Sequence, residues 1–168
     1  MGLRWWTATT LLFVAALLQT SFLPALGLVS ARPDFVLQCI VIWAVLRGVR
    51  ETLPWAFIGG LLLDLFSGGT FGTTALVLVL VAFCSSVGEI SLLKSNALIP
   101  IVMVFWASVL DGLLTLFFLA SQHYHLDWLA TLRQVVVPNA LLNTACAPLT
   151  YWLMSRIERR ARQRLQLA

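Results

Sequence analysis

The chain has 168 residues, of which 60% are hydrophobic and only 11% are charged, and its formal net charge is +4. Soluble domains carry about 25% charged residues, so this composition excludes an ordinary soluble protein. We interpret the chain as an integral membrane protein with a single domain over residues 1–168, because several spans of about 20 residues each leave no room for a soluble domain.

Six apolar segments follow one another along the chain. They cover roughly residues 5–29, 34–46, 53–66, 71–88, 97–120 and 135–154. The second and third are short: a helix over 53–66 would rise about 20 Å, against a hydrocarbon core of about 30 Å. Such a segment must tilt, extend past its apolar limits, or dip into the membrane without crossing it. The pattern predicts a compact all-α bundle of six transmembrane helices.

The basic residues predict the orientation of this bundle. If all six segments cross and the N-terminus is cytoplasmic, nine of the 11 Lys and Arg residues fall on the inner side. We therefore expect both termini to be cytoplasmic. Five of the nine belong to a basic tail over residues 155–168, for which anionic lipid is the expected partner: Arg156, Arg159, Arg160, Arg162 and Arg164.

Polar residues within the segments fall in the outer half of the membrane on this topology. They include Gln19, Gln38, Asp64, Asp111, Asn139 and Asn143. Asn139, Asn143, Cys146 and Thr150 have the spacing of one helical face, which is costly to point at lipid. Two interpretations remain open: an outer polar cleft that holds a partner, a lipid or a small ligand, or a polar seam that only bonds neighbouring helices.

The run "GGLLLDLFSGG", residues 59–69, places one carboxylate between two glycine pairs. Asp64 would lie about one helical turn below the outer surface. It is expected either to be a buried hydrogen-bond acceptor that holds the turn "SGG" or to contact a partner directly. The glycines in and after this run are expected to allow close helix packing or a turn: Gly59, Gly60, Gly68, Gly69 and Gly72.

The region around Asp64 resembles the signature of the rod shape-determining MreD family. In that signature an "RPD" helix start is followed by a "GxxxGLxxDLxxxxxxG" pattern. Here "RPDFVLQCIVIWAVLRGVRETLPWAFIGGLLLDLFSGGTFGTTAL" covers residues 32–76. The matching positions are Arg32, Pro33, Asp34, Gly60, Leu61, Asp64, Leu65 and Gly72.

This resemblance implies a non-enzymatic inner-membrane scaffold of the bacterial cell-elongation machinery. Such a protein would bind MreC and help couple the MreB cytoskeleton to peptidoglycan synthesis by RodA and a penicillin-binding transpeptidase, and so maintain rod shape. The sequence contains no Gly-rich phosphate loop, no His/Cys metal set within the apolar segments and no serine in a nucleophile elbow. We therefore expect no catalytic residue, cofactor or metal, and no nucleic acid among the partners.

Two alternatives belong to the class of transporters. The family is similar in architecture to the six-helix substrate-binding subunits of energy-coupling-factor vitamin transporters, for which an outer polar cleft would be equally suitable. The first segment lacks their Ala-x-x-x-Ala surface, because Leu12 and Gln19 stand four residues beyond Ala8 and Ala15. Proton-coupled transport through Asp64 and Asp111 is the other alternative, and the inner half offers it no acidic relay residue within a segment.

The loop "QHYHLDW", residues 122–128, places His123, His125 and Asp127 at alternate positions. An extended strand would put these metal-capable side chains on one side. Tyr124 and Trp128 are instead typical of the aromatic belt at a membrane interface, and we interpret the loop as interfacial.

Overall fold

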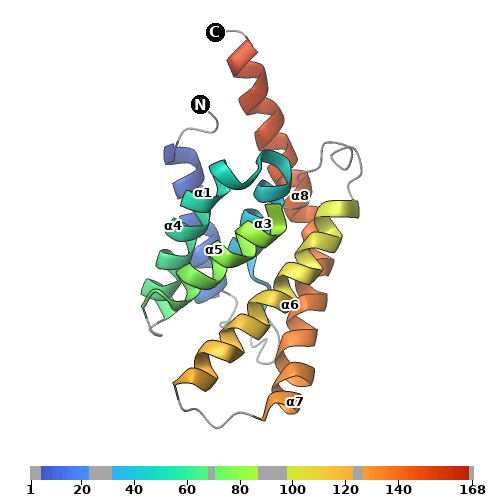
Figure 1. Ribbon diagram of the computed structural model, residues 1–168. Helices are drawn as coiled ribbons and strands as arrows, with labels where there is room; N and C mark the ends of the chain where they lie inside the picture. The colour runs from blue at the N-terminus through green and yellow to red at the C-terminus, as the bar shows by residue number, and fades with distance from the viewer. Residues whose placement is uncertain (1–4, 23–31, 68–70, 87–97, 123–126, 167–168) are drawn as a thin grey trace.

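A computed structural model describes residues 5–22, 32–67, 71–86, 98–122 and 127–166 (Figure 1). Within these ranges the secondary structure is helical and contains no strand, which confirms the predicted all-α class. The helices are α1 (Trp5–Leu17), the π-helical η1 (Leu18–Phe22), α3 (Phe35–Arg47), α4 (Val49–Ser67), α5 (Thr73–Ser85), α6 (Leu98–Ser121), the one-turn α7 (Trp128–Thr131), the π-helical η4 (Leu132–Val136) and α8 (Val137–Gln166).

Helix α3 lies at the centre of the bundle. It packs against α1, α4, α5, α6 and α8, and every residue from Val36 to Val45 is buried. A helix that is apolar all round is stable only when other helices enclose it, which the run "VLQCIVIWAV" satisfies. Figure 1 shows the first turn of α1 and the last turns of α8 at one end of the molecule and α7 at the other.

Two helices extend beyond the predicted apolar segments, because the polar residues next to these segments are also helical. Helix α4 has 19 residues and begins at Val49, because Arg50, Glu51 and Thr52 are helical although they are polar. The third predicted segment, 53–66, is therefore longer than its apolar run. Helix α8 has 30 residues and continues through the predicted boundary at residue 155, so the start of the basic tail extends the same helix. Residues 23–29 of the first predicted segment, 87–88 of the fourth and 97 of the fifth lie outside the described residues.

Among the described helices, α6 is long and apolar enough to cross a membrane, judged by length and composition only. Three shorter apolar helices cover Ala8–Ser21, Phe35–Arg47 and Thr73–Ser85. The outward side of α6 carries exposed Val102, Trp106 and Phe117, and Trp106 is 63% exposed. A large apolar side chain so placed fits a lipid-facing surface. The count of six spans stays a prediction.

Helices α4 and α5 cross closely at Gly60. A Cβ atom at this position would lie 2.2 Å from Cα of Ala75, so a glycine is required there. At Gly59 a Cβ would meet only side-chain ends, Val36 Cγ1 at 3.0 Å and Ile40 Cδ1 at 3.3 Å. Gly72 has φ +93° at the start of α5, a conformation that disfavours other residues. Gly68 and Gly69 lie outside the described residues.

The far end of α3 is joined to α8 by a charged contact. Arg47 Nε lies 3.5 Å from Glu158 Oε1, and the Arg47 guanidinium also lies 5.8 Å from the ring centroid of Trp43. Both charged side chains are mostly buried, which strengthens the attraction relative to a surface pair. This contact and the polar contacts described below hold α3 against α8 near both ends.

We expect Gly60→Ala to destabilise the bundle by about 2 kcal/mol, because the added methyl forces the α4 and α5 backbones apart. The free energy of unfolding would be measured by titrating SDS into dodecylmaltoside micelles. Gly59→Ala is the matched control, with an expected cost below about 1 kcal/mol because side-chain ends can shift. Equal effects of the two substitutions would contradict a backbone contact specific to Gly60.

Candidate functional site: a polar seam and an adjoining cavity

Asp64 accepts hydrogen bonds from the first turn of α5. Its Oδ2 accepts from the N–H groups of Gly72 at 2.8 Å and Ala75 at 3.2 Å, and its Oδ1 accepts from the N–H of Thr74 at 3.0 Å. The first N–H groups of a helix have no partner within that helix, and a carboxylate there also interacts favourably with the helix dipole. Asp64 is 3% exposed. It therefore has the role of a buried acceptor that holds the turn between α4 and α5.

Asn143 on α8 joins α3 and α6. Its Oδ1 accepts from the backbone N–H of Asp34 at 2.6 Å and from Nε2 of Gln38 at 3.2 Å, and its Nδ2 donates to Oγ of Ser108 at 3.0 Å. Asn143 is 3% exposed and Gln38 is 0% exposed, so no bulk water replaces these bonds. One amide thus links three helices.

Further polar contacts lie about one turn before and two turns after Asn143 along α8. Thr150 Oγ1 lies 2.7 Å from Oε1 of Gln38, to which it donates. Asn139 Oδ1 accepts from the backbone N–H of Arg32 at 3.0 Å. The face that spacing predicted on α8 therefore lies against α3, from the residues before its first turn to Gln38. We call Gln38, Ser108, Asn139, Asn143 and Thr150 the polar seam.

The start of α3 is capped in addition by its own chain and by η1. Asp34 is the N-cap, and its Oδ1 accepts from the N–H of Leu37 at 2.8 Å. Gln19 Oε1, on η1, lies 3.4 Å from the N–H of Val36 and accepts from it. Backbone N–H groups at the beginning of α3 are thus satisfied by side chains from three elements, as a helix start buried in an apolar bundle requires.

A cavity of about 600 Å³ adjoins the polar seam. Both π-helical segments contribute to its lining, Gln19 and Thr20 from η1 and Val135 and Val136 from η4. Asn139 and Asn143 line it from the seam side, and the described residues further contribute Arg32, Asp34, Ser108 and Asp111. The volume is in the range of ligand sites.

The structure divides the residues that the sequence grouped as one outer cleft. Asp111, Asn139 and Asn143 line the cavity, whereas Gln38 and Asp64 are buried elsewhere and are absent from its described lining. The expected cleft beside Asp64 and Gln38 is corrected in this respect: both side chains are used in bonds within the bundle. His123 and His125 lie outside the described residues, and Asp127 caps α7 by accepting from the N–H of Ala130 at 3.2 Å.

Three polar contributors were not singled out as candidate site residues by the sequence. Ser108 is a lone hydroxyl in a long apolar segment, and nothing in its neighbours distinguishes it from a packing residue. Thr150 was recognised only as a member of the α8 face. The role of Asp34 as an N-cap follows from its place directly before an apolar run, a pattern that could have identified it.

The two acids of the "RPD … DL … G" run both act on helix starts: Asp34 caps α3, and Asp64, near the end of α4, accepts from Gly72 at the start of α5. A family model described as rod shape-determining protein MreD matches residues 2–157. The chain belongs to the MreD family. MreD proteins are membrane proteins of cell shape and are not known as enzymes, and this membership supports a role in rod-shape determination.

Searches of curated proteins and of solved structures give no match for this MreD chain. The similarity to substrate-binding subunits of energy-coupling-factor transporters therefore stays a prediction.

Replacing the Asp64 carboxylate is expected to loosen the start of α5. Asp64→Asn would keep the size but turn an amide NH₂ or a single oxygen toward three N–H groups, at a cost of about 2–3 kcal/mol. Unfolding in SDS would measure this cost. Asp127→Asn is the control, because Asn is as good an N-cap as Asp on the exposed α7. A similar loss in both variants would show that Asp64 has no special structural role.

The stability cost of removing an amide side chain from the polar seam is expected to depend on its position along α8. Asn143→Ala leaves the Asp34 N–H and the Gln38 amide without their acceptor and should cost about 2 kcal/mol in the free energy of unfolding. Asn139→Ala, the control on the same face, removes a bond to Arg32 in an exposed position, where water substitutes, and should cost under about 1 kcal/mol. The reverse order of the two values in SDS unfolding would contradict the assigned bonds.

Proposed function

We propose that this MreD chain is a non-enzymatic scaffold of the cell-elongation machinery in the bacterial inner membrane. In this proposal it binds MreC and helps couple MreB to peptidoglycan synthesis by RodA and a penicillin-binding transpeptidase. The observation that carries the proposal is the family match over residues 2–157, which includes the signature and all helices up to the start of the tail.

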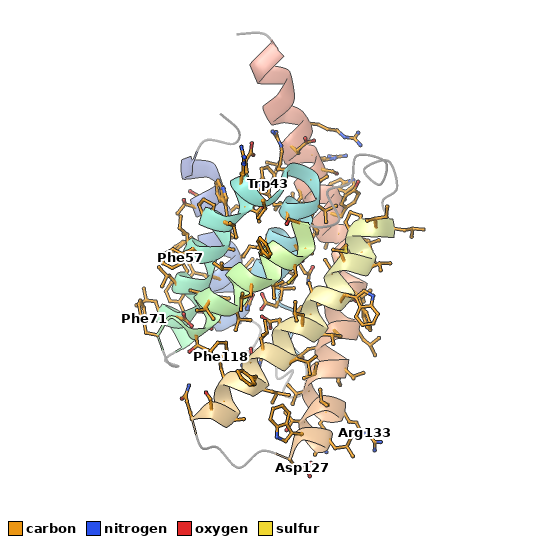
Figure 2. The ribbon with its side chains drawn as sticks, viewed as in Figure 1. Trp43, Phe57, Phe71, Phe118, Asp127 and Arg133 are labelled. Atoms are coloured by element: carbon orange, nitrogen blue, oxygen red, sulfur yellow. The ribbon has the colours of Figure 1, made fainter. Side chains whose placement is uncertain are left out.

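The distribution of charge supports a multi-pass orientation with both termini in the cytoplasm. Figure 2 shows Trp43 near the end where α8 leaves the bundle and Asp127 and Arg133 at the opposite end. Arg47, which contacts Trp43, and the arginines of α8 beyond Ser155 belong to the first end. From the positive-inside rule we infer that the tail end is cytoplasmic and that the end with α7 faces the periplasm.

The tail supports an additional contact with anionic lipid. Arg156 and Arg159 are exposed on α8, and the Arg156 guanidinium lies 3.9 Å from the Trp152 ring centroid. The side chains of Arg160, Arg162 and Arg164 lie outside the described ones. Basic side chains next to an interfacial tryptophan are suited to the head-group region, where each contributes about 1 kcal/mol of attraction.

Burial decides which residues meet MreC in this proposal. Asp64, Gln38 and Asn143 have their hydrogen-bonding groups inside the bundle, so they act on partner binding by fixing α3 and α5. The contact surface is assigned to exposed parts of the periplasmic end, where Trp128 and Leu129 begin α7. An exposed tryptophan and leucine offer the kind of apolar anchor found at protein interfaces.

The cavity favours one alternative function, a substrate-binding subunit of a vitamin-type energy-coupling-factor transporter. Its volume of about 600 Å³ would hold a small molecule. This alternative requires association with an ATPase module, whereas the scaffold requires association with MreC. The proteins recovered with the chain therefore distinguish the two.

The test is expression of the tagged chain in rod-shaped cells depleted of their own MreD. We expect rod shape to return and MreC to co-purify after gentle extraction. Asp64→Asn should recover less MreC, at least several-fold, because the α4–α5 turn is loosened, and Asp127→Asn should recover the wild-type amount. A stably inserted chain that restores neither shape nor MreC binding would refute the scaffold, and an ATPase module in place of MreC would establish the alternative.

A further inference from the structure

The cavity beside the polar seam contains a carboxylate for which the bundle supplies no partner. Asp111 of α6 lines the cavity and is partly exposed to it. In the described part of the chain its carboxylate accepts no hydrogen bond and forms no ion pair, in contrast to Asp64 with three N–H donors. An unpaired acid within a membrane helix is expensive to maintain and marks a functional position by default.

A second carboxyl group lines the same cavity. Asp34 lines it from the start of α3, so two carboxyl groups line one cavity. The nearby polar groups already form hydrogen bonds: Asn143 through its Oδ1 and its Nδ2, and Asp34 through its Oδ1. Like charges in one cavity are mutually unfavourable, and a cation between them would relieve the repulsion.

The other residues that line the cavity indicate which kind of molecule would supply such a cation. Arg32, which is exposed, contributes a positive charge to the lining. Leu63 and Phe66 of α4 and Leu116 and Leu119 of α6 add apolar walls. The complementary ligand therefore has an ammonium group, an anionic group a few bonds away, and an apolar part. A free inorganic cation would leave the apolar walls and Arg32 unused.

We propose that this cavity binds the zwitterionic head group of an amine-bearing membrane phospholipid, of the phosphatidylethanolamine class. The ammonium group meets Asp111 and Asp34, the phosphate meets Arg32, and the upper parts of the acyl chains pass along Leu116 and Leu119. A lipid is the amphiphile present at highest concentration around a membrane protein, which favours it over a free organic amine of the same chemistry. This inference rests on the cavity and not on the proposed binding of MreC.

The proposed site should discriminate between head groups. A primary ammonium donates three N–H bonds to carboxylate and amide oxygens, whereas a quaternary ammonium donates none and is recognised by aromatic cages. Phe66 is the one aromatic residue in the described lining, so no such cage is present there. Phosphatidylglycerol lacks the cation altogether. The expected order of affinity is ethanolamine head group first, then choline, then glycerol.

The experiment titrates short-chain lipids onto the full-length chain in a mild detergent, with native mass spectrometry counting the bound lipids. We expect dihexanoyl-phosphatidylethanolamine to bind at one copy, at least ten-fold more tightly than the choline and glycerol lipids. Asp111→Asn should lower this affinity at least ten-fold, since the neutral amide of Asn no longer attracts the ammonium. Asp127→Asn, which keeps an N-cap outside the cavity, should leave it unchanged.

Several outcomes would overturn the inference. Equal binding of all three lipids, or equal binding by wild-type chain and Asp111→Asn, would show that the head group does not enter the cavity. Ethanolamine phosphate without acyl chains, added alone, should bind more weakly than the lipid, and tighter binding of this soluble amine would refute the lipid as the source. Circular dichroism and SDS unfolding of Asp111→Asn exclude loss of fold as the cause, and Arg32→Gln gives a second variant that should lower affinity for the phosphate-bearing lipid.

Discussion

The bundle depends on hydrogen-bond acceptors for the first turn of α3, the helix at its centre. Helix α3 is enclosed by five other helices, and the N–H groups at a helix start have no partner of their own. Asn143, Gln19 and the side chain of Asp34 provide these acceptors from α8, η1 and the chain just before α3. A buried N–H group without an acceptor costs about 1–3 kcal/mol, so the Asn143 amide of α8 helps to fix the position of α3.

The first N–H groups of α5 also need hydrogen-bond acceptors, at the turn between α4 and α5. Asp64 supplies the acceptors, and Gly60 removes the side chain that would keep the two helices apart. Both residues belong to the run that resembles the MreD signature, and local geometry explains each of them without a partner protein. Asp64 and Gly60 therefore determine how the α4–α5 hairpin closes.

Sequence alone was sufficient for the features that follow from composition and period. An all-α chain, a polar face on α8 and the approximate limits of α3 and α6 were predicted, since each depends on residues close together in the chain. The partners of that face were not predictable, because Gln38 and Ser108 meet Asn143 only through tertiary packing. Asp64 and Asp111 look alike in sequence, as lone acids in apolar runs. Only the structure shows that one is satisfied by three N–H groups and the other faces a cavity.

The bonds of Asn143 and Thr150 to α3 join residues 105 to 112 positions apart. During synthesis α3 leaves the ribosome long before α8, so for that interval Gln38 and the amide of Asp34 are without their final partners. An insertion intermediate that lacks the last helix is consequently an open, under-bonded assembly, of the kind that membrane chaperones retain and proteases remove. Arrival of α8 is then the step that closes the molecule, and a chain that stops before residue 143 cannot complete it.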